Sequence, residues 1–511
     1  MTQSPTQPHL AERAARAPER EAAVFVAADG TVSAVRTYVE LDQRSLSFAA
    51  WLHADGVRPG QVIAVMTPNI PELLEVAWAA QRSGLYVTAV NTHLRRDEAA
   101  HVLRDCGARV VVTTPGLVSL VLAAVPDGVQ VLITGETESY ELALISIDED
   151  DLREVPPLEG DFMLYSSGTT GLPKGIKRQL PELPLGQPPH ALALMLGSFG
   201  INENSTYLCP APLYHAAPLA WTMATQRLGG RVVILESFDA ATALGVIDGF
   251  SVTHAQFVPT MFVRMLKLTD QERETFSGAS LQLAIHAAAP CPPEVKRAMI
   301  DWWGPILLEF YSATEGIGMT LINSEEWLAH PGSVGKAVMG EPQVLDDEGN
   351  ELPVGQVGTI WFTGGSSFAY HGDPAKARGA FDAAGRATVG DIGWLDDDGY
   401  LYLSDRKDFM IISGGVNVYP QEIENHLVEH PEVLDAAVLG STDSDLGQVP
   451  VAFVQLVLGA TVNEEELRNW CRSALSSIKC PRSVTLVDAL PRTPTGKLRK
   501  HELRDLAEAV R

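Results

Sequence analysis

The densest group of chemically able residues is a loop of hydroxyls, glycines and one lysine at residues 165–175. Its sequence is YSSGTTGLPKG, and it follows a short apolar run at 162–164. Glycines let backbone N–H groups approach a ligand closely, hydroxyls add donors and Lys174 adds positive charge, so the loop is suited to hold a polyphosphate. A Walker A loop would place its lysine between glycine and Ser or Thr, whereas Lys174 lies between Pro173 and Gly175. We therefore expect a nucleoside triphosphate site that is not a P-loop.

Four further residues, each in a segment of its own, carry charges that suit the same ligand. Glu315, in the segment EFYSATEG, is a hard oxygen ligand for a metal that bridges phosphates. Asp391 can accept hydrogen bonds from a ribose diol, and Arg406 is its possible partner. Lys497, in PRTPTGKL, could stabilise the transition state in which a carboxylate attacks the α-phosphorus of ATP, because two anions meet there. Taken singly, each is more often a packing, turn or surface residue.

In this order, and over nearly the whole chain, the segments resemble those of the adenylate-forming superfamily of acyl-CoA synthetases, beetle luciferases and peptide-synthetase adenylation domains. The resemblance implies catalysis by Lys497, Thr170, Glu315 and His215, with Glu315 as the magnesium ligand. It also implies that Tyr311 stacks on adenine. The implied ATP-binding residues are Ser166, Ser167, Gly168, Thr169, Thr170, Gly171, Lys174, Ala288, Glu309, Phe310, Tyr311, Thr314, Asp391 and Arg406.

The segment 409–424 is similar to the version found in acyl-CoA synthetases, where a glycine turn lines the channel for the pantetheine arm. Gly414, Gly415 and Asn417 would line that channel, and Asp408 would be the hinge about which a C-terminal domain rotates between the two half-reactions. Relatives often carry a lysine at the position of Gly414, so its absence here weakens the inference of coenzyme A.

The carboxylate pocket is less sharply marked. His215 resembles the histidine that gates the acyl site, and a structural histidine is the alternative. For His286 the structural alternative is the better one. The residues that could line an acyl or aryl pocket are His215, Trp221, His286, Ala287, Ile317 and Met319. Fatty, aryl and heteroaryl acids all remain open.

The elements that must position these residues show an α/β rhythm. Short apolar runs such as 62–65, 85–90 and 110–112 alternate with helical patterns such as 73–82, which predicts a parallel, helix-covered sheet. The same rhythm resumes after residue 189, so we expect two α/β subdomains.

Short strands separated by Asp/Gly turns between 320 and 402 predict a small β-barrel-like subdomain. We expect a large adenylation domain at 1–407 that binds ATP and the acid. A small, mobile α+β domain at 408–511 would follow and carry the catalytic lysine.

Composition narrows the function class. The chain has 511 residues, a net charge of −26 and 46% hydrophobic residues, which is typical of a soluble globular protein and disfavours nucleic acid and anionic membranes as partners. No apolar run approaches the roughly 18 residues of a membrane span, and we expect a cytoplasmic protein that is a monomer or a homodimer. The five cysteines show neither a disulfide nor a zinc pattern. The HLVEH segment at 426–430 matches a zinc-protease pattern, and we attribute the match to chance.

The expected activity is a two-step ligation that uses ATP, Mg²⁺ and coenzyme A. A carboxylic acid would form an acyl-adenylate with release of pyrophosphate, and the thiol of coenzyme A would then displace AMP. The alternative enzyme is an amide synthetase that passes the same intermediate to an amine. A nucleotide- or acyl-binding protein without turnover is a third reading, disfavoured because a pure binder has no use for Lys497.

Overall fold

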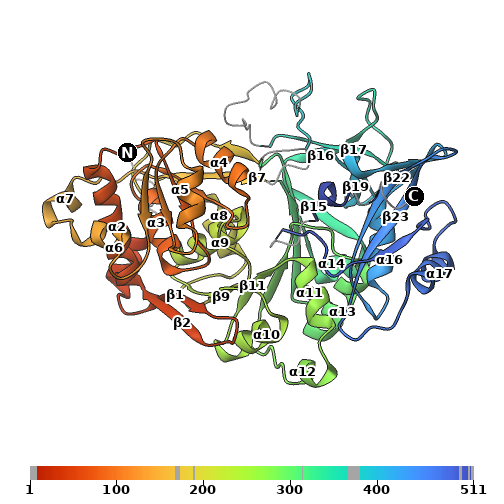
Figure 1. Cartoon of the computed structure of the whole chain (residues 1–511), viewed down its shortest axis with the longest axis horizontal. Coiled ribbons are helices and arrows are strands. Elements are labelled where there is room, and N and C mark those ends of the chain that lie inside the picture. Colours follow the sequence, from red (N-terminus) through yellow and green to blue (C-terminus); the bar gives the residue numbers. More distant parts are fainter. Residues whose placement is uncertain are drawn as a thin grey trace. The chain divides into compact units, whose positions relative to one another are not determined.

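The computed structural model describes residues 9–166, 173–187, 190–313, 315–365, 380–493, 498–504 and 507 (Figure 1). The chain forms two compact units. Unit 1 is Met1–Gln256, Gly278–Leu283 and Phe368–Ala377, and unit 2 is Phe257–Ser277, Ala284–Ser367 and Arg378–Arg511. No helix within the described ranges is both long and apolar enough to span a bilayer.

The first sheet of unit 1 has the strand order β6-β5-β3-β4-β7-β8. All neighbours pair in parallel except β7 and β8, which are antiparallel. This confirms the predicted parallel α/β sheet. The strands are β3 (Val62–Met66), β4 (Tyr86–Ala89), β5 (Ala108–Thr113), β6 (Gln130–Ile133), β7 (Asp161–Ser166) and β8 (Lys174–Lys177), and the associated helices include α3 (Pro71–Gln81), α4 (Arg96–Asp105) and α5 (Val118–Ala124).

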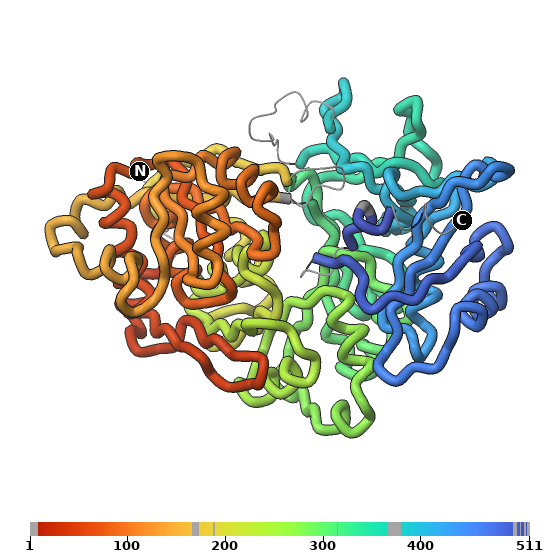
Figure 2. Tube along the Cα trace, viewed as in Figure 1, coloured from red at the N-terminus to blue at the C-terminus, as the bar shows by residue number. Residues whose placement is uncertain are grey.

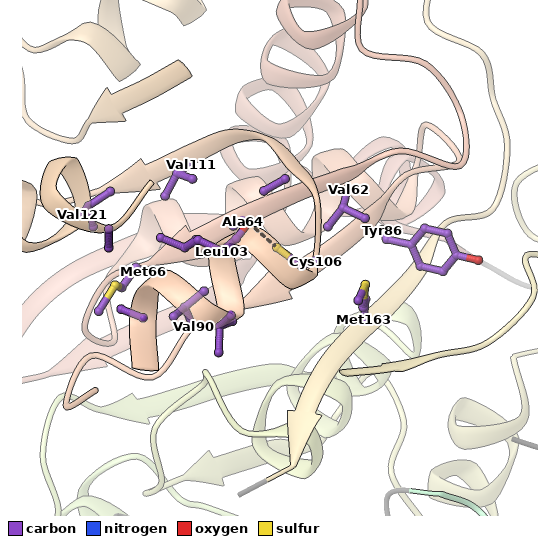
Figure 3. Packing of buried hydrophobic residues seen from close by; sticks show 14 residues of the cluster. Val62, Ala64, Met66, Tyr86, Val90, Leu103, Cys106, Val111, Val121 and Met163 are labelled. Carbon is purple, nitrogen blue, oxygen red and sulfur yellow. Dashed lines mark hydrogen bonds between the residues drawn. The ribbon is translucent and has the colours of Figure 1, made fainter. Parts of the chain in front are cut away.

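Continuous apolar runs in these strands arise because both faces of the sheet are covered. Val62, Ala64 and Met66 of β3 point to one face and pack against Leu103 of α4 and Val121 of α5 (Figure 3). The helical pattern predicted at 73–82 is α3, which begins with Pro71 at its first turn and buries nearly all of its residues.

A second group of strands in unit 1 has the order β11-β9-β10-β1-β2. All neighbours pair in parallel except β1 and β2. The strands are β1 (Glu21–Val26), β2 (Val32–Thr37), β9 (Thr206–Cys209), β10 (Arg231–Leu235) and β11 (His254–Phe257), and the helices are α1 (Leu10–Arg16), α2 (Tyr38–Ala54), α6 (Ser139–Ile145), α7 (Glu149–Arg153), α8 (Ala191–Ser198), α9 (Ala216–Arg227) and α10 (Ala240–Gly249).

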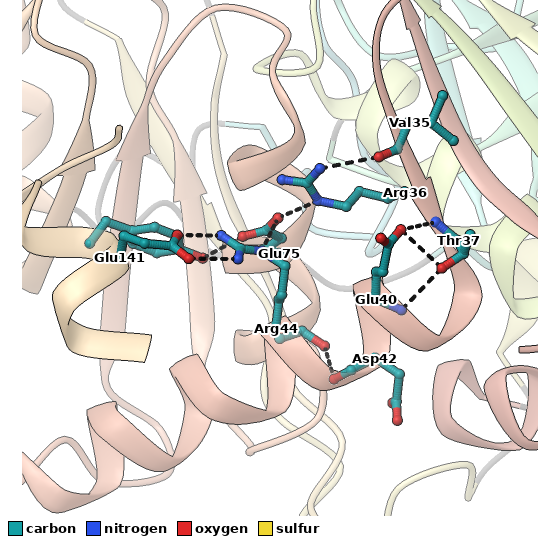
Figure 4. Close-up of polar contacts among 10 residues, drawn as sticks. Val35, Arg36, Thr37, Glu40, Asp42, Arg44, Glu75 and Glu141 are labelled. Carbon is teal, nitrogen blue, oxygen red and sulfur yellow. Dashed lines mark hydrogen bonds and ion pairs between the residues drawn. The ribbon is translucent and has the colours of Figure 1, made fainter. Parts of the chain in front are cut away.

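A buried carboxylate, Glu75 of α3, fastens several of these elements together (Figure 4). Its Oε1 accepts from Nε of Arg36 in β2 at 2.8 Å and from Nε of Arg44 in α2 at 2.7 Å. Its Oε2 accepts from the hydroxyl of Tyr140 in α6 at 3.1 Å. Arg44 also forms a two-point contact with Glu141 at 3.0 and 2.7 Å. Four elements therefore share one charge network whose geometry fixes their mutual placement.

Unit 2 contains a sheet with the order β12-β13-β14-β15-β19-β18-β17-β16. β12 and β13 are parallel, and the remaining pairs are antiparallel, which confirms the predicted change of pattern after residue 320. The strands are β12 (Leu283–His286), β13 (Leu307–Ser312), β14 (Met319–Asn323), β15 (Ser333–Met339), β16 (Glu341–Leu345), β17 (Gly358–Thr363), β18 (Asp391–Leu395) and β19 (Leu401–Arg406), and the helices are α11 (Pro259–Leu266), α12 (Asp270–Glu274), α13 (Pro293–Trp303) and α14 (Ser324–Ala329).

The C-terminal part of unit 2 is a mixed α+β layer with its own apolar cluster. The short 3-10 helix η2 (Lys500–Leu503) packs against β22 in this layer, which is drawn in blue in Figure 2. A domain boundary at 407/408 stays a prediction. The elements are η1 (Lys407–Phe409), β20 (Ile411–Ser413), β21 (Val416–Val418), α16 (Pro420–Val428), β22 (Val433–Asp443), β23 (Gly447–Leu456), α17 (Glu464–Ala474) and β24 (Val484–Leu486).

Candidate active site

The glycine-rich loop connects two paired strands of unit 1. β7 ends at Ser166 and β8 begins at Lys174, and these two residues are partners in the antiparallel ladder. The hairpin is fixed at its base, since the hydroxyl of Tyr165 donates to Asp105 at 2.5 Å and the ring of His101 bonds the carbonyl of Pro173 at 3.0 Å. The predicted ATP-binding residues Ser167, Gly168, Thr169, Thr170 and Gly171 lie outside the described residues. The structure thus defines the two strand ends between which the glycine-rich loop runs.

The predicted ribose-binding aspartate lies in unit 2 where three strands meet. Asp391 of β18 is the register partner of Arg406 in β19, and its Oδ1 lies 3.1 Å from Nε of Arg406. Its Oδ2 accepts from the hydroxyl of Tyr311 in β13 at 2.6 Å. Asp391 is only 8% exposed. The structure therefore brings together Tyr311, Asp391 and Arg406, although Tyr311 lies 80 positions before Asp391 and 95 before Arg406 in the chain. Each carboxylate oxygen of Asp391 keeps a lone pair for a further donor.

Tyr311 is held in its neutral form. Burial, followed by the adjacent charge of Asp391, raises the pKa of its phenol well above the usual range. The negative charge of Glu315 adds to this rise in the pKa. The Tyr311 ring centroid is 6.3 Å from that of Phe362. Tyr311 therefore has a fixed place beside Asp391, and its stacking on adenine stays a prediction.

Glu315 follows β13 in a turn and is partly buried. Its neighbour Thr314, a predicted ATP contact, lies outside the described residues. Across the described ranges, the chain gathers no group of three or more His, Cys, Asp and Glu side chains that could hold a metal ion by themselves. Magnesium on a nucleotide commonly takes one or two protein carboxylates and completes its shell with phosphate oxygens and water. Glu315 fits that donor set.

Glu309 and Phe310 start the segment that resembles the adenine-binding motif. The structure gives Glu309 a partner inside the core, because its Oε2 lies 2.5 Å from Nζ of Lys296 in α13. Sequence reasoning did not single out Lys296. Its place among Val295, Met299 and Ile300 on the buried face of α13 was a signal that could have identified it.

The predicted acyl-pocket residues fall in both units. Unit 2 holds His286, Ala287, Ile317 and Met319, of which the first three are buried and Met319 is partly buried. Ala288, the predicted ATP contact that follows them, is exposed and has a φ of +75°. Few non-glycine residues adopt this left-handed region, because Cβ approaches the carbonyl oxygen there.

Unit 1 holds His215 and Trp221, the other two predicted pocket residues. His215 is the N-cap of α9, and its Nε2 is buried with no hydrogen-bond partner among the described residues. Burial lowers the pKa of His215 to about 4, so its ring is neutral at pH 7. Trp221 lies in α9, 6.5 Å from the ring of Tyr207 and 6.4 Å from that of Phe199, which is a core position.

The glycine turn predicted to admit a thiol arm joins β20 to β21. Gly414 and Gly415 have φ values of +54° and +79° and are exposed, as is Asn417. Both φ values lie in the left-handed region, which glycine adopts without the steric cost of a Cβ atom. Asp408, the predicted hinge, is exposed in the short turn η1.

Lys497 lies outside the described residues, and the structure describes both ends of its loop. Arg492 and Leu498 form a bridge, and the backbone N–H of Arg499 donates to the carbonyl of Pro491 at 2.7 Å. Beyond them, Nζ of Lys500 lies 2.7 Å from Oε1 of Glu424 in α16, and both are at least nine-tenths buried. The two ends are therefore closed on each other and anchored to the C-terminal layer.

The ring of His426, the first histidine of the HLVEH segment, is fully engaged with other groups. Its Nδ1 contacts Glu429 at 2.8 Å and its Nε2 contacts the carbonyl of Trp470 at 3.2 Å. Neither ring nitrogen is left to bind a metal.

Two family models match the chain along most of its length. The model described as "AMP-binding enzyme" matches residues 10–369, and the one described as "AMP-binding enzyme C-terminal domain" matches residues 422–497. The chain belongs to the AMP-binding enzyme family. Asp391 and Arg406 of this AMP-binding enzyme lie between the two matched ranges, on the antiparallel strands β18 and β19.

Individual relatives agree with this assignment. The AMP-binding enzyme is 31% identical to a feruloyl-CoA synthase of Amycolatopsis sp., over 92% of this chain and 93% of that protein. It is 27% identical to the solved o-succinylbenzoate CoA synthetase of Bacillus subtilis, whose structure contains an acyl-adenylate, with a TM-score of 0.81 and 98% of each chain covered. The amide bond synthetase of Marinactinospora thermotolerans has the same fold, with a TM-score of 0.77 at 24% identity over 97% of this chain and 99% of that one.

Proposed function

We propose that this AMP-binding enzyme is an AMP-forming acid–thiol ligase. A carboxylate oxygen of the substrate attacks the α-phosphorus of Mg-ATP, so that pyrophosphate leaves and an acyl-adenylate remains. The thiol of coenzyme A then loses its proton and attacks the acyl carbon, which releases AMP and gives an acyl-CoA. The observation that carries the proposal is the cluster of Tyr311, Asp391 and Arg406, because it combines a buried, pre-positioned carboxylate for a diol with an aromatic ring beside it.

The remaining roles are proposed on the sequence motifs. The loop between β7 and β8 would hold the phosphates, and Glu315 would bind the magnesium that neutralises them. Lys497 would lie between the attacking carboxylate and the α-phosphate, where a cation lowers the barrier most. The small, exposed turn at Gly414 and Gly415 would leave room for the pantetheine arm.

The acid is proposed to be aromatic. The named acids of the similar proteins are ferulate, 2-succinylbenzoate and 4-coumarate. Each of these similarities extends over at least 88% of the relative's own length.

An amide synthetase is the second candidate. Gly414 stands where acyl-CoA synthetases often place a lysine, and the fold is shared with a solved amide bond synthetase. Such an enzyme would use the same residues for adenylation and would differ only in the acceptor.

The test is pyrophosphate release over a panel of aromatic and fatty acids with Mg-ATP, run without acceptor, with coenzyme A and with simple amines. Products are identified by mass spectrometry. Acyl-CoA supports the ligase, and amide formed without coenzyme A supports the second candidate. Lys497→Ala should abolish acid-dependent pyrophosphate release, whereas Lys336→Ala, which changes an exposed lysine of β15, should not. A folded protein that releases no pyrophosphate with any acid would overturn both.

A further inference from the structure

Unit 2 contains a buried cluster of three titratable side chains beside the predicted nucleotide residues. His286, the last residue of β12, is the register partner of Glu309 in β13. Glu309 Oε2 lies 2.5 Å from Nζ of Lys296 and 3.7 Å from Nε2 of His286. His286 and Lys296 have no exposed surface, and Glu309 is 5% exposed.

Lys296 and Glu309 form a direct ion pair, and the imidazole of His286 makes no hydrogen bond to it. An ammonium and a carboxylate at 2.5 Å form a charge-assisted hydrogen bond. The distance of 3.7 Å from His286 to the carboxylate is too long for a hydrogen bond. Burial and the nearby charge of Lys296 lower the pKa of His286 well below its usual range, so the ring is neutral.

Neither ring nitrogen of His286 has a hydrogen-bond partner among the described residues. A neutral imidazole carries one N–H donor and one lone-pair acceptor, and burying both without partners costs free energy. Phe262 presents its ring to the imidazole at a centroid distance of 5.4 Å in an edge-to-face arrangement, and it offers no polar atom. The unmet nitrogens therefore point to a partner that is not part of the described chain.

The electrostatics of the cluster select the tautomer. Nε2 faces the Glu309 carboxylate, and an N–H dipole is favoured on that side because a lone pair would be repelled by the negative charge. Nδ1 then carries the lone pair and is an acceptor. A ligand that meets it must bring a donor such as O–H or N–H.

The cluster lies on the face of the sheet from which Tyr311 projects. Residues two apart on a strand share a face, so Glu309 and Tyr311 project from the same face of β13. Ala287 and Ala288 follow His286 directly and are small. The imidazole thus lies next to the strand end that presents Tyr311 to Asp391.

We propose that His286 is a specificity-determining residue that accepts a hydrogen bond from an O–H or N–H group of the carboxylic acid substrate. The inference rests on the proposed function, and it narrows the substrate to aromatic acids that carry such a donor. Acids whose distal group only accepts hydrogen bonds would leave the Nδ1 lone pair unmet.

The test compares matched pairs of acids, namely 4-hydroxybenzoate with benzoate and 4-hydroxycinnamate with cinnamate. The ratio of kcat/KM for acid-dependent pyrophosphate release, hydroxy acid over its counterpart, should be at least about 10 in the natural protein for one or both pairs. His286→Phe should bring this ratio to about 1, chiefly by raising KM for the hydroxy acid. His286→Gln, which restores an acceptor oxygen, should retain part of the preference.

The matched control is His254→Gln. His254 is another buried histidine, but both of its ring nitrogens are bonded, to Thr253 at 2.8 Å and to Phe199 at 3.1 Å. The control should keep the natural ratio. A ratio that is already about 1 in the natural protein, or that survives His286→Phe, would overturn the proposal and indicate that a resident water meets the ring.

A failure of the ligase proposal is distinguished by direct binding. If no acid releases pyrophosphate, calorimetric titration of the same four acids into the natural protein and into His286→Phe decides the point. Tighter binding of the hydroxy acids that disappears in the variant supports the role of His286. Equal binding, or no binding, overturns it.

Discussion

Among single residues, replacement of Lys296 has the largest predicted effect on stability. Replacing it by methionine leaves the Glu309 carboxylate buried and without its partner. Removing one member of a buried ion pair costs about 3–5 kcal/mol, so Lys296→Met should lower the free energy of unfolding by that order. Urea denaturation followed by circular dichroism measures it. Lys407→Met, which breaks an exposed contact with Asp347, should change the midpoint little, and equal effects of both changes would contradict this account.

His215 predicts a pH dependence of stability. Its pKa is about 4 in the folded chain against an ordinary value of 6.5, so between these pH values the unfolded chain binds more protons. Stability contributed by the neutral ring is therefore present above pH 6.5 and is lost as the pH falls toward 4. His215→Gln should reduce the fall in the urea midpoint between pH 7 and pH 5. An unchanged fall would show that other groups account for it.

The candidate site was predictable where motifs fix residue types. Asp391, Arg406 and Tyr311 were all expected, and the structure places them in contact. Their contact could not be derived from spacing, since it depends on the pairing of β18 with β19. Lys296 was missed because lysine side chains are mostly exposed, and the carboxylate that pairs with it, Glu309, lies on a different element, β13.

At the level of elements, the loop that carries Lys497 is held by its anchors. Arg492 donates to both carboxylate oxygens of Asp435 in β22, at 2.5 and 2.7 Å. Arg492→Ala should therefore lower kcat for adenylation at least about 10-fold with little change in KM for ATP. The reason is that Lys497 is still present but its loop is less precisely positioned.

A matched arginine tests this prediction. Arg482→Ala removes a side chain that is 63% exposed and makes a single contact of 3.3 Å with Asp443. An exposed ion pair of this kind contributes little, so we expect near-natural kcat. Stopped-flow measurement of pyrophosphate release compares the two variants. Equal kcat in folded Arg492→Ala and in the natural protein would contradict the anchoring role.

Strands were predictable from the sequence where a continuous run of apolar residues marks them. The apolar runs at β3, β4 and β5 were expected, because strands covered on both faces require continuous apolar residues. The strands before residue 60 were not predicted. β1 pairs with β10, about two hundred residues later, and such a parallel partner leaves no mark on the local sequence.

Over the whole molecule, net charge sets a kinetic expectation. The chain carries −26, and ATP, a carboxylate and coenzyme A are all anions. Raising the ionic strength from about 10 mM to about 150 mM shortens the Debye length from about 30 Å to about 8 Å and weakens long-range repulsion. At fixed Mg²⁺, kcat/KM for ATP should rise over this range. A decrease would show that a positive local field outweighs the net charge.

The division of the chain between the two units was the least predictable property. Contacts assign Phe257–Ser277 to unit 2 and Gly278–Leu283 to unit 1, an interleaving that the sequence did not predict, and the expected domain boundary at 407/408 stays a separate prediction. Such interleaving depends on which strand each segment joins. Composition and periodicity describe a segment by itself and contain no information on its distant partner.

The left-handed alanine at position 288 has a practical consequence for engineering. Glycine would relieve about 1 kcal/mol of backbone strain there, so a screen for heat resistance should favour Ala288→Gly. The same change removes a methyl group at the predicted adenine contact, and we expect it to raise KM for ATP. Melting temperature and KM measured on one variant check both expectations. Selection for thermal stability would then favour glycine at position 288, whereas selection for activity at low ATP concentration would favour alanine.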